Sequence, residues 1–227
     1  MKRILAWVAA ALGVAALGAV FAAAQYRETI EEPAHKVVAR GEGIELRDYT
    51  PMIVAEVTVE GDRRKATRAG FQRLAAYIFA QDRPGAAQDE GDEKIAMTSP
   101  VMQNQSEKIA MTSPVMQDSA KADGTESSDG PWRTRFVMPS KYTMESLPQT
   151  PEDIILSEVP GRRMAAIMFS GMGSKTDLAQ METMLRSWMK AEGHKAAGPV
   201  EYAFYDGPWV PARFRRNEVM IPVVKAQ

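Results

Sequence analysis

The eleven-residue string EKIAMTSPVMQ occupies residues 93–103 and recurs, letter for letter, at residues 107–117. It reads as one β-strand written twice. The copies lie 14 residues apart, an even number, so a strand shifted by one whole repeat keeps the same side chains on the same face of a sheet. Two registers are therefore open. We favour the second copy, at residues 108–117, with the first in an enlarged loop; the alternative is a long hairpin outside the sheet, in which residues 97–102 pair with residues 111–116.

Outward from that strand, the first half of the chain reads as a strand, a helix and two further strands. Residues 53–60 alternate between apolar and polar side chains, which is the period of a half-buried strand. After the duplicated strand come a low-complexity stretch at residues 118–130, rich in Ser, Gly and Asp, and a strand at residues 132–138. Residues 63–81 are predicted to form an amphipathic helix, because one face carries apolar side chains at helical spacing: Phe71, Leu74, Ala75 and Ile78.

The second half repeats this order. Residues 164–169 read as a strand, and Ser174 is the expected N-cap of a helix that Gly193 ends. Two strands follow at residues 200–205 and 218–224. The two strand-to-helix units are offset by about 112 residues, which indicates an internal structural duplication. We therefore expect an α+β fold, in which a curved sheet of antiparallel hairpins carries two helices.

Composition bounds the class of protein. The chain has 227 residues, of which 45% are hydrophobic and 25% charged, so a single globular domain can bury a sizeable core. The net charge of −1 argues against nucleic acid as a partner, because such binding needs a basic face. The absence of cysteine excludes disulfides, thiolate metal sites and covalent c-type haem attachment. Two histidines are too few for most histidine-based metal centres.

The N-terminus reads as a targeting segment. Lys2 and Arg3 precede an apolar run at residues 4–24, which suits a secretory signal peptide or an uncleaved transmembrane helix; both remain open. Either places the protein in the periplasm or anchored to the inner membrane and facing the periplasm. We assign residues 1–24 to this segment, residues 25–35 to a linker and residues 36–227 to the folded domain, in which residues 83–130 hold the duplicated strand and a flexible loop.

Five segments together resemble the SOUL haem-binding protein family. The resemblance covers nearly all of residues 36–224 and implies a distorted antiparallel β-barrel flanked by two helices, with a pseudo-twofold repeat of strand-helix-strand-strand units. It also implies binding of haem or another tetrapyrrole. The segments are IELRDY at 44–49, the helix side chains Phe71, Leu74, Tyr77 and Ile78, KIAMTSPV at 94–101, FVMP at 136–139, and a closing region with Tyr205, Pro208, Pro211, Phe214 and RRNEV at 215–219.

A haem site needs an apolar groove for the ring and cations for its two carboxylates. By resemblance, the groove lies between the first helix and the loop at residues 206–214. The expected apolar walls are Phe71, Leu74 and Ile78 on the helix, with Trp209 and Phe214 on the loop. The expected cations are Arg63, Arg64, Lys65 and Arg68, where they oppose the helix dipole, and a second group at Arg213, Arg215 and Arg216. Arg216 has an alternative role, which is to pair with Glu218 in the closing strand.

No axial iron ligand is evident, so haem is expected as a reversible cofactor whose metal ligand is unknown. His35 falls in the linker, and His194 follows the second helix, where a cation can satisfy the terminal carbonyls. Methionine and tyrosine can also ligate haem iron, but 15 methionines single out no position.

We therefore expect a non-enzymatic haem or tetrapyrrole binder that acts as carrier, buffer or scavenger. The alternative is an effector-binding module for another small apolar ligand, related in fold to gyrase-inhibitor-like proteins. An enzyme acting on a lipid or pigment, or a structural envelope protein with an empty groove, would also have this fold. The GMGSKT sequence at residues 171–176 lacks the spacing of a phosphate loop and is expected to be a turn with a helix cap.

Overall fold

The computed structural model describes residues 31–81, 112–119, 129–207 and 209–225. These residues form two helices, one short 3-10 turn and ten strands. In chain order they are β1 (His35–Gly41), β2 (Ile44–Tyr49), β3 (Met52–Asp62), α2 (Arg63–Ile78), β4 (Val115–Ser119), β5 (Asp129–Val137), β6 (Ile155–Val159), β7 (Arg162–Phe169), α3 (Lys175–Ala191), β8 (His194–Ala196), β9 (Glu201–Phe204), η1 (Ala212–Phe214) and β10 (Asn217–Lys225).

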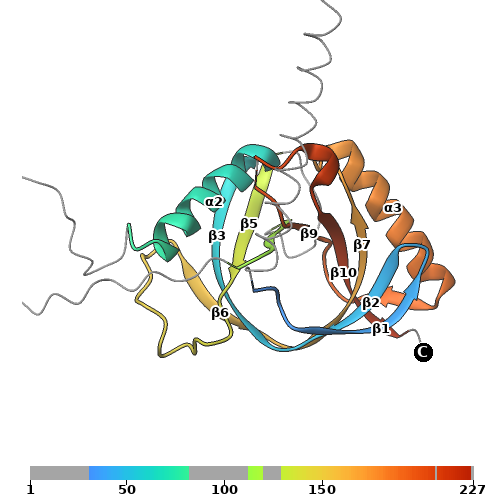
Figure 1. Ribbon diagram of the computed structural model, residues 1–227, viewed down its shortest axis with the longest axis horizontal. Helices are drawn as coiled ribbons and strands as arrows, with labels where there is room; N and C mark the ends of the chain where they lie inside the picture. The colour runs from blue at the N-terminus through green and yellow to red at the C-terminus, as the bar shows by residue number, and fades with distance from the viewer. Residues whose placement is uncertain (1–30, 82–111, 120–128, 208, 226–227) are drawn as a thin grey trace, which may run out of the picture.

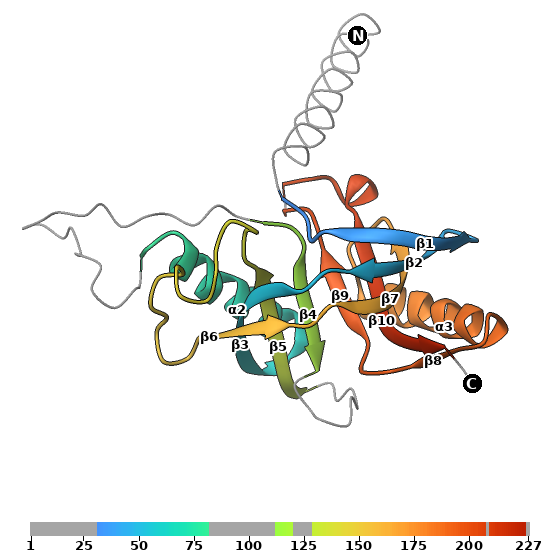
Figure 2. The same ribbon diagram turned by 90° about the horizontal axis from the view of Figure 1, so that it is seen from below.

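The strands form one antiparallel sheet in the order β1-β2-β7-β10-β9-β4-β5-β3-β6, with β8 added at the end of β10. The sheet curls strongly, with α2 against its outer surface on one side and α3 on the other (Figure 1). The α+β class, the antiparallel sheet and the two helices are as predicted. The distorted barrel is an open one: the edge strands β1 and β6 do not pair with each other within the described residues (Figure 2). Lys36 and Arg40 are exposed on β1, and such charges discourage further pairing at an edge.

The predicted internal duplication is present. The order β3-α2-β4-β5 recurs as β7-α3-β9-β10, and the two halves meet where β4 pairs with β9. The predicted capping box of the second helix is also present: the Asp177 N–H donates to Ser174 Oγ at 3.2 Å and the Ser174 N–H to Asp177 Oδ2 at 3.0 Å. Gly193 follows α3 in a left-handed conformation, with φ of 70°, which glycine adopts without strain.

Strand β4 is made by the second copy of the duplicated string, as we favoured. Val115, Met116 and Gln117 come from that copy and pair with both β5 and β9. The strand continues through Asp118 and Ser119, which we had assigned to the low-complexity loop, and β5 begins at Asp129, earlier than expected. The first copy, the proposed hairpin and the rest of the flexible loop lie outside the described residues.

The core lies mainly on the helix-bearing face of the sheet. Under α3 it is built from alternate residues of β2, β7 and β10, such as Leu46, Ile167 and Val219. Under α2 it is built from β3 and β5, with Val57 and Phe136 against the helix. The intervening residues of the same strands point to the inner, concave face, where a smaller cluster of methionine, alanine and tyrosine side chains is also buried. Burial on both faces explains why so many strand residues are apolar.

The inner face also carries a buried charge network. Glu218, with 0% of its surface exposed, accepts two bonds from the Arg47 guanidinium, at 2.8 and 3.1 Å, and one from the Tyr205 hydroxyl at 2.8 Å. Arg216 donates to the same carboxylate at 2.9 Å, so the predicted Arg216–Glu218 pair is confirmed. This network joins β2, β10 and Tyr205, the residue that follows β9. A second one joins β4, β5, β7 and β9 through two acceptors, Asp118 and Glu201, and their arginine donors, Arg133, Arg135 and Arg162.

Three predictions need correction: the linker and the roles of the two histidines. Residues 31–34 are held against the domain and do not act as a free linker: the Ser113 N–H donates to the Glu31 carbonyl at 3.1 Å, and Glu32 pairs with Arg216 at 2.9 Å. His35 is the first residue of β1, with its ring 4.8 Å from the Tyr49 ring. His194 does not cap α3 but opens β8, where its ring lies 5.8 Å from Trp188.

Neither described helix is long and apolar enough to cross a membrane. The predicted signal or anchor segment at residues 1–24 lies outside the described residues.

Gly70 sets how closely α2 approaches the sheet. A Cβ added there would lie 2.6 Å from Thr134 Oγ1 and 2.8 Å from Thr134 Cβ, on the completely buried face of β5. Alanine favours a helix over glycine by about 1 kcal/mol, but overpacking of this kind costs roughly 1–3 kcal/mol. The difference of the two effects should lower the free energy of unfolding of Gly70→Ala by up to about 2 kcal/mol in urea denaturation, whereas Gln72→Ala, exposed on the same helix, stays within about 0.5 kcal/mol. A midpoint raised by Gly70→Ala would contradict the close approach.

Candidate functional site

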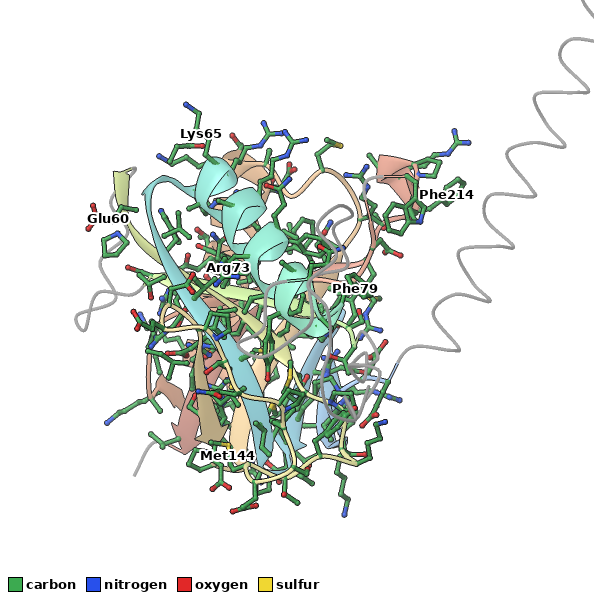
Figure 3. All side chains as sticks on the ribbon, turned by 90° about the vertical axis from the view of Figure 1, so that its left-hand side faces the viewer. Glu60, Lys65, Arg73, Phe79, Met144 and Phe214 are labelled. Carbon is green, nitrogen blue, oxygen red and sulfur yellow. The ribbon has the colours of Figure 1, made fainter. Side chains whose placement is uncertain are left out.

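A cavity of about 710 Å³ lies between the first half of α2, the start of β4, the end of β9 and two loops. One loop, at residues 171–173, joins β7 to α3; the other runs from Tyr205 to Arg215 through η1. These elements meet at the upper side of Figure 1, and Figure 3 looks onto α2 with Lys65 at its first turn and Phe214 on the neighbouring loop. The volume of the cavity falls in the range of small-molecule sites, about 300–1,000 Å³. A second hollow, on the inner face beside Tyr49, holds only about 10 Å³ and has room for little more than a water molecule.

The walls of the cavity are apolar and aromatic. Phe71 is 36% exposed and Trp209 67% exposed, so two large aromatic side chains are accessible from the cavity. Phe71 is held at its edge by Phe136, with ring centroids 5.3 Å apart. Trp209 lies against Gly207, where an added Cβ would come within 2.3 Å of the indole. Val115 and Phe204 complete these walls from the strands β4 and β9.

Three cations at the mouth of the cavity have no side-chain partner within the described part of the chain. Arg64, Lys65 and Arg68 are all exposed and line the cavity from the first two turns of α2. These cations lie at the positive end of the helix dipole, where the one carboxylate at the helix start, the N-cap Asp62, accepts the Lys65 N–H at 3.2 Å. An anion bound here would relieve both the mutual repulsion of these groups and their conflict with the dipole.

Arg63 has a different role from its neighbours. Its guanidinium donates to the Gly173 carbonyl at 3.2 Å and to Gln117 Oε1 at 3.3 Å, and it lies 5.6 Å from the Tyr202 ring centroid. The Gln117 side-chain amide donates back to the Arg63 carbonyl at 3.3 Å. Arg63 therefore ties α2 to the second half of the molecule and fixes the width of the cavity.

Two polar side chains at the floor of the cavity already form hydrogen bonds within the protein. Tyr205 donates its hydroxyl to Glu218, and burial, together with the negative charge of Glu218, raises the pKa of Tyr205 well above its ordinary value. Asp206 accepts the Arg216 N–H at 2.6 Å. Both side chains shape the loop and are poorly placed for acid–base chemistry at the cavity.

Six of the nine predicted site residues line the cavity: Arg63, Arg64, Lys65, Arg68, Phe71 and Trp209. The other three were misplaced. Leu74 and Ile78 are 0% and 1% exposed, because the apolar stripe of α2 turns towards β3 and β5 and only Phe71, at its N-terminal end, reaches the cavity. Phe214 belongs to η1 and does not line the cavity; its ring lies 4.7 Å below the guanidinium of Arg213. Of the second cationic group only Arg215 lines the cavity.

Sequence reasoning missed the side of the cavity formed by the second half of the chain. Met172, Gly173, Phe204 and Asn217 line it there, and Val115 lines it from the duplicated strand. The predicted turn at residues 171–176 was correct, but no periodic pattern marks a loop residue as a neighbour of a helix more than 100 positions earlier. The internal duplication was the available signal, because it places this loop beside the junction of the two halves.

These residues fit a tetrapyrrole. Haem is a flat apolar ring with two carboxylates at one edge, and the cavity offers aromatic walls with three cations at its mouth that have no side-chain partner among the described residues. A bare metal ion fits less well, since no cluster of three His, Cys, Asp or Glu side chains occurs among the residues that the structure describes.

Comparison with known proteins agrees with this geometry. The profile of a family described as SOUL heme-binding protein matches residues 30–105 and 102–222, and the two ranges meet between the copies of the duplicated string. A search of curated proteins finds no match.

Several solved structures share the fold. EcmrR, in the cryo-EM structure of its DNA complex, has a TM-score of 0.56 at 12% identity. The alignment covers 99% of this chain and 71% of the EcmrR chain. An uncharacterized conserved protein from Listeria innocua has a TM-score of 0.54 at 14% identity, over 82% of this chain and 94% of its own. The C-terminal domain of EcmrR has a TM-score of 0.51 at 13% identity, over 81% and 98%. At such identities the likeness concerns the fold alone.

Proposed function

Because the chain belongs to the SOUL haem-binding protein family, we propose that it binds haem or a related tetrapyrrole reversibly in the α2 cavity, as a carrier, buffer or scavenger that catalyses no reaction. One observation carries the proposal: a 710 Å³ apolar cavity opens between cations that have no partner in the described residues. The bound group supplies an iron and a conjugated ring. The protein supplies the surface that shields the ring and the charges that hold its carboxylates.

The magnitudes favour reversible binding. Burying roughly 200 Å² of apolar ring surface gains about 5 kcal/mol. Exposed ion pairs add at most about 1 kcal/mol each. These gains total about 7–8 kcal/mol, and association costs several kcal/mol of translational and rotational freedom, so the net affinity is weaker than micromolar, which would need about 8 kcal/mol. A ligand held this way can be handed on, which suits a carrier or buffer.

The rim cations give the first test of the site. In the triple variant Arg64→Gln, Lys65→Gln and Arg68→Gln, we expect the haem dissociation constant to rise about 5- to 30-fold, equivalent to about 1–2 kcal/mol of lost charge pairing. The melting temperature should hold or rise, because these cations oppose the helix dipole. The measurement is a Soret titration of the full chain at low and high salt, where added salt should weaken the wild type more than the variant.

The matched control removes the same charge elsewhere. Lys36, Lys190 and Lys195 are exposed and do not line the cavity, so their replacement by Gln should leave the haem affinity unchanged. Equal losses in both triple variants would mean that net charge, and not the rim, attracts the ligand.

The alternative of an effector-binding module is limited by the same charges. A rim of arginine and lysine repels organic cations and attracts organic anions. We therefore expect metal-free protoporphyrin, which keeps both carboxylates, to compete with haem, and a lipophilic cation of similar size not to compete. Competition by the cation would favour the alternative.

For localisation, we propose that the domain acts in the periplasm or on the periplasmic face of the inner membrane. The proposal is supported by Lys2 and Arg3 ahead of the apolar run at residues 4–24. A reporter enzyme that is active only in the periplasm, fused after Gln227, should be active. Activity of a reporter that works only in the cytoplasm would contradict the proposal.

A further inference from the structure

The cavity contains a candidate iron ligand that is not a histidine. Neither histidine lines it: His35 contacts Tyr49 near the inner face of the sheet, and His194 contacts Trp188 beyond the end of α3. Among the described lining residues, the side chains with atoms that could bind iron are Lys65, Met172, Tyr205 and Asp206.

Three of these four are occupied or unsuited. The Tyr205 hydroxyl is a donor to Glu218 at 2.8 Å, and an iron ligand would have to be the phenolate that burial disfavours. Asp206 accepts the Arg216 N–H at 2.6 Å. Lys65 is exposed at the mouth, where its ammonium group suits a carboxylate and would have to lose its proton to bind a metal. Met172 remains, and its thioether has no proton to lose.

The position of Met172 is fixed by the conformation and hydrogen bonds of its loop. It lies in the loop between β7 and α3, flanked by Gly171 and Gly173, whose φ angles of 132° and 62° favour glycine. The loop is tied on both sides of the methionine. The Asn217 side-chain amide donates to the Gly171 carbonyl at 3.1 Å, and Arg63 donates to the Gly173 carbonyl at 3.2 Å.

The side chain of Met172 is exposed and does not belong to the buried core. It is 57% exposed, yet it lines the cavity, with Sδ 3.5 Å from Arg215 Nη1. A thioether sulfur has two lone pairs, so one N–H contact orients it and leaves the other lone pair available. Arg215 is in turn fixed by donation to the Val210 carbonyl at 2.7 Å. The sulfur is thus held at the cavity by a chain of defined contacts.

We propose that the thioether sulfur of Met172 would ligate the iron of bound haem; the inference rests on the proposed function. Methionine ligation favours ferrous over ferric iron and raises the reduction potential of haem. Binding of ferrous haem should therefore be tighter than binding of ferric haem. A neutral, weak ligand also suits reversible exchange better than a histidine pair would.

The test uses the full chain loaded with haem and three variants: Met172→Leu, Met172→His and Met184→Leu. Met184 is exposed on α3 and does not line the cavity, so it is the matched control. The readouts are the Soret positions of ferrous and ferric haem and the reduction potential. The wild type and Met184→Leu should share the Soret positions and the potential, Met172→Leu should shift the ferrous Soret band and lower the potential, and Met172→His should give the spectrum of a nitrogen ligand.

The outcomes separate the two proposals. If the wild type binds haem saturably but Met172→Leu has the same spectrum and potential, the ligand assignment is overturned and the proposed function stands. If the wild type shows no saturable binding of haem in either oxidation state, the proposed function is overturned and the assignment falls with it.

Discussion

Replacing Glu218 by Gln should lower the free energy of unfolding by up to about 3–5 kcal/mol, the cost of breaking a buried ion pair. Arg47 is almost fully buried and donates two hydrogen bonds to this carboxylate, and Arg216 adds a further donor group. Glu45 still pairs with Arg47 at 2.8 Å and Glu32 with Arg216 at 2.9 Å, but an amide removes the buried charge that both guanidinium groups share. Urea denaturation followed by circular dichroism measures the loss.

The matched control is Asp48→Asn, the same chemical change on β2, the strand that also carries Arg47. Asp48 also accepts two bonds from one arginine, Arg163, at 2.6 and 2.7 Å, but both partners are exposed. Exposed pairs contribute about 0–1 kcal/mol, so Asp48→Asn should be nearly neutral. Comparable losses of unfolding free energy in the two variants would show that any carboxylate–arginine pair stabilises the fold equally. That result would contradict the special contribution of the buried network.

The network also predicts the pH dependence of stability. Burial by itself would raise the pKa of Glu218, but the hydrogen bonds and charge of Arg47, with the charge of Arg216, outweigh burial and hold that pKa below its ordinary value of 4.5. A carboxyl with a lowered folded-state pKa contributes stability above its unfolded pKa and loses it as pH falls through the folded pKa. We expect the wild type to lose stability below about pH 4.5 and Glu218→Gln to lose less. Parallel curves for the two proteins would be the contrary result.

Filling the cavity should have the largest effect on ligand binding. Thr67 lines the cavity from α2, one turn before Phe71, and its hydroxyl donates to the Arg63 carbonyl at 2.7 Å. In Thr67→Trp the indole would occupy the space of the ring and deny it roughly 80 Å² of apolar contact, about 2 kcal/mol. The haem dissociation constant should rise at least about 30-fold.

Thr183→Trp is the control for that substitution. Thr183 makes the same kind of bond, to the Ala179 carbonyl at 2.8 Å, and is exposed on α3 away from the cavity. It should change neither the Soret spectrum nor the affinity. Unchanged affinity in Thr67→Trp would place the ligand elsewhere on the molecule.

Local signals predicted most of the fold. The period of two at residues 53–60, the capping box at Ser174 and the apolar face of α2 each correspond to an element of the structure. The even spacing of the duplicated string allowed two registers, and only the partners of β4 could decide between them. Closure of the sheet could not be predicted, because it depends on the geometry of β1 and β6 and not on their composition.

The site was predicted less completely, for physical reasons. The sequence does not distinguish Arg63 from Arg64 and Lys65. In the structure Arg63 donates a hydrogen bond to the Gly173 carbonyl, whereas the other two lie at the mouth of the cavity. Leu74 and Phe71 share one helical stripe, and a small rotation of α2 decides which of them is core. Met172 is one of 15 methionines, and only the packing of two distant loops distinguishes it.

The most direct test is to map bound haem by nuclear magnetic resonance, with metal-free protoporphyrin as the diamagnetic reference. Ferric iron broadens the amide signals of nearby residues. With one equivalent of ferric haem, we predict selective broadening at Thr67, Phe71, Gly207 and Arg215, with the signals of α3 beyond its first turn unaffected. Broadening centred on the inner face around Tyr49 and Met116, or spread evenly over the domain, would contradict a tetrapyrrole site beside α2.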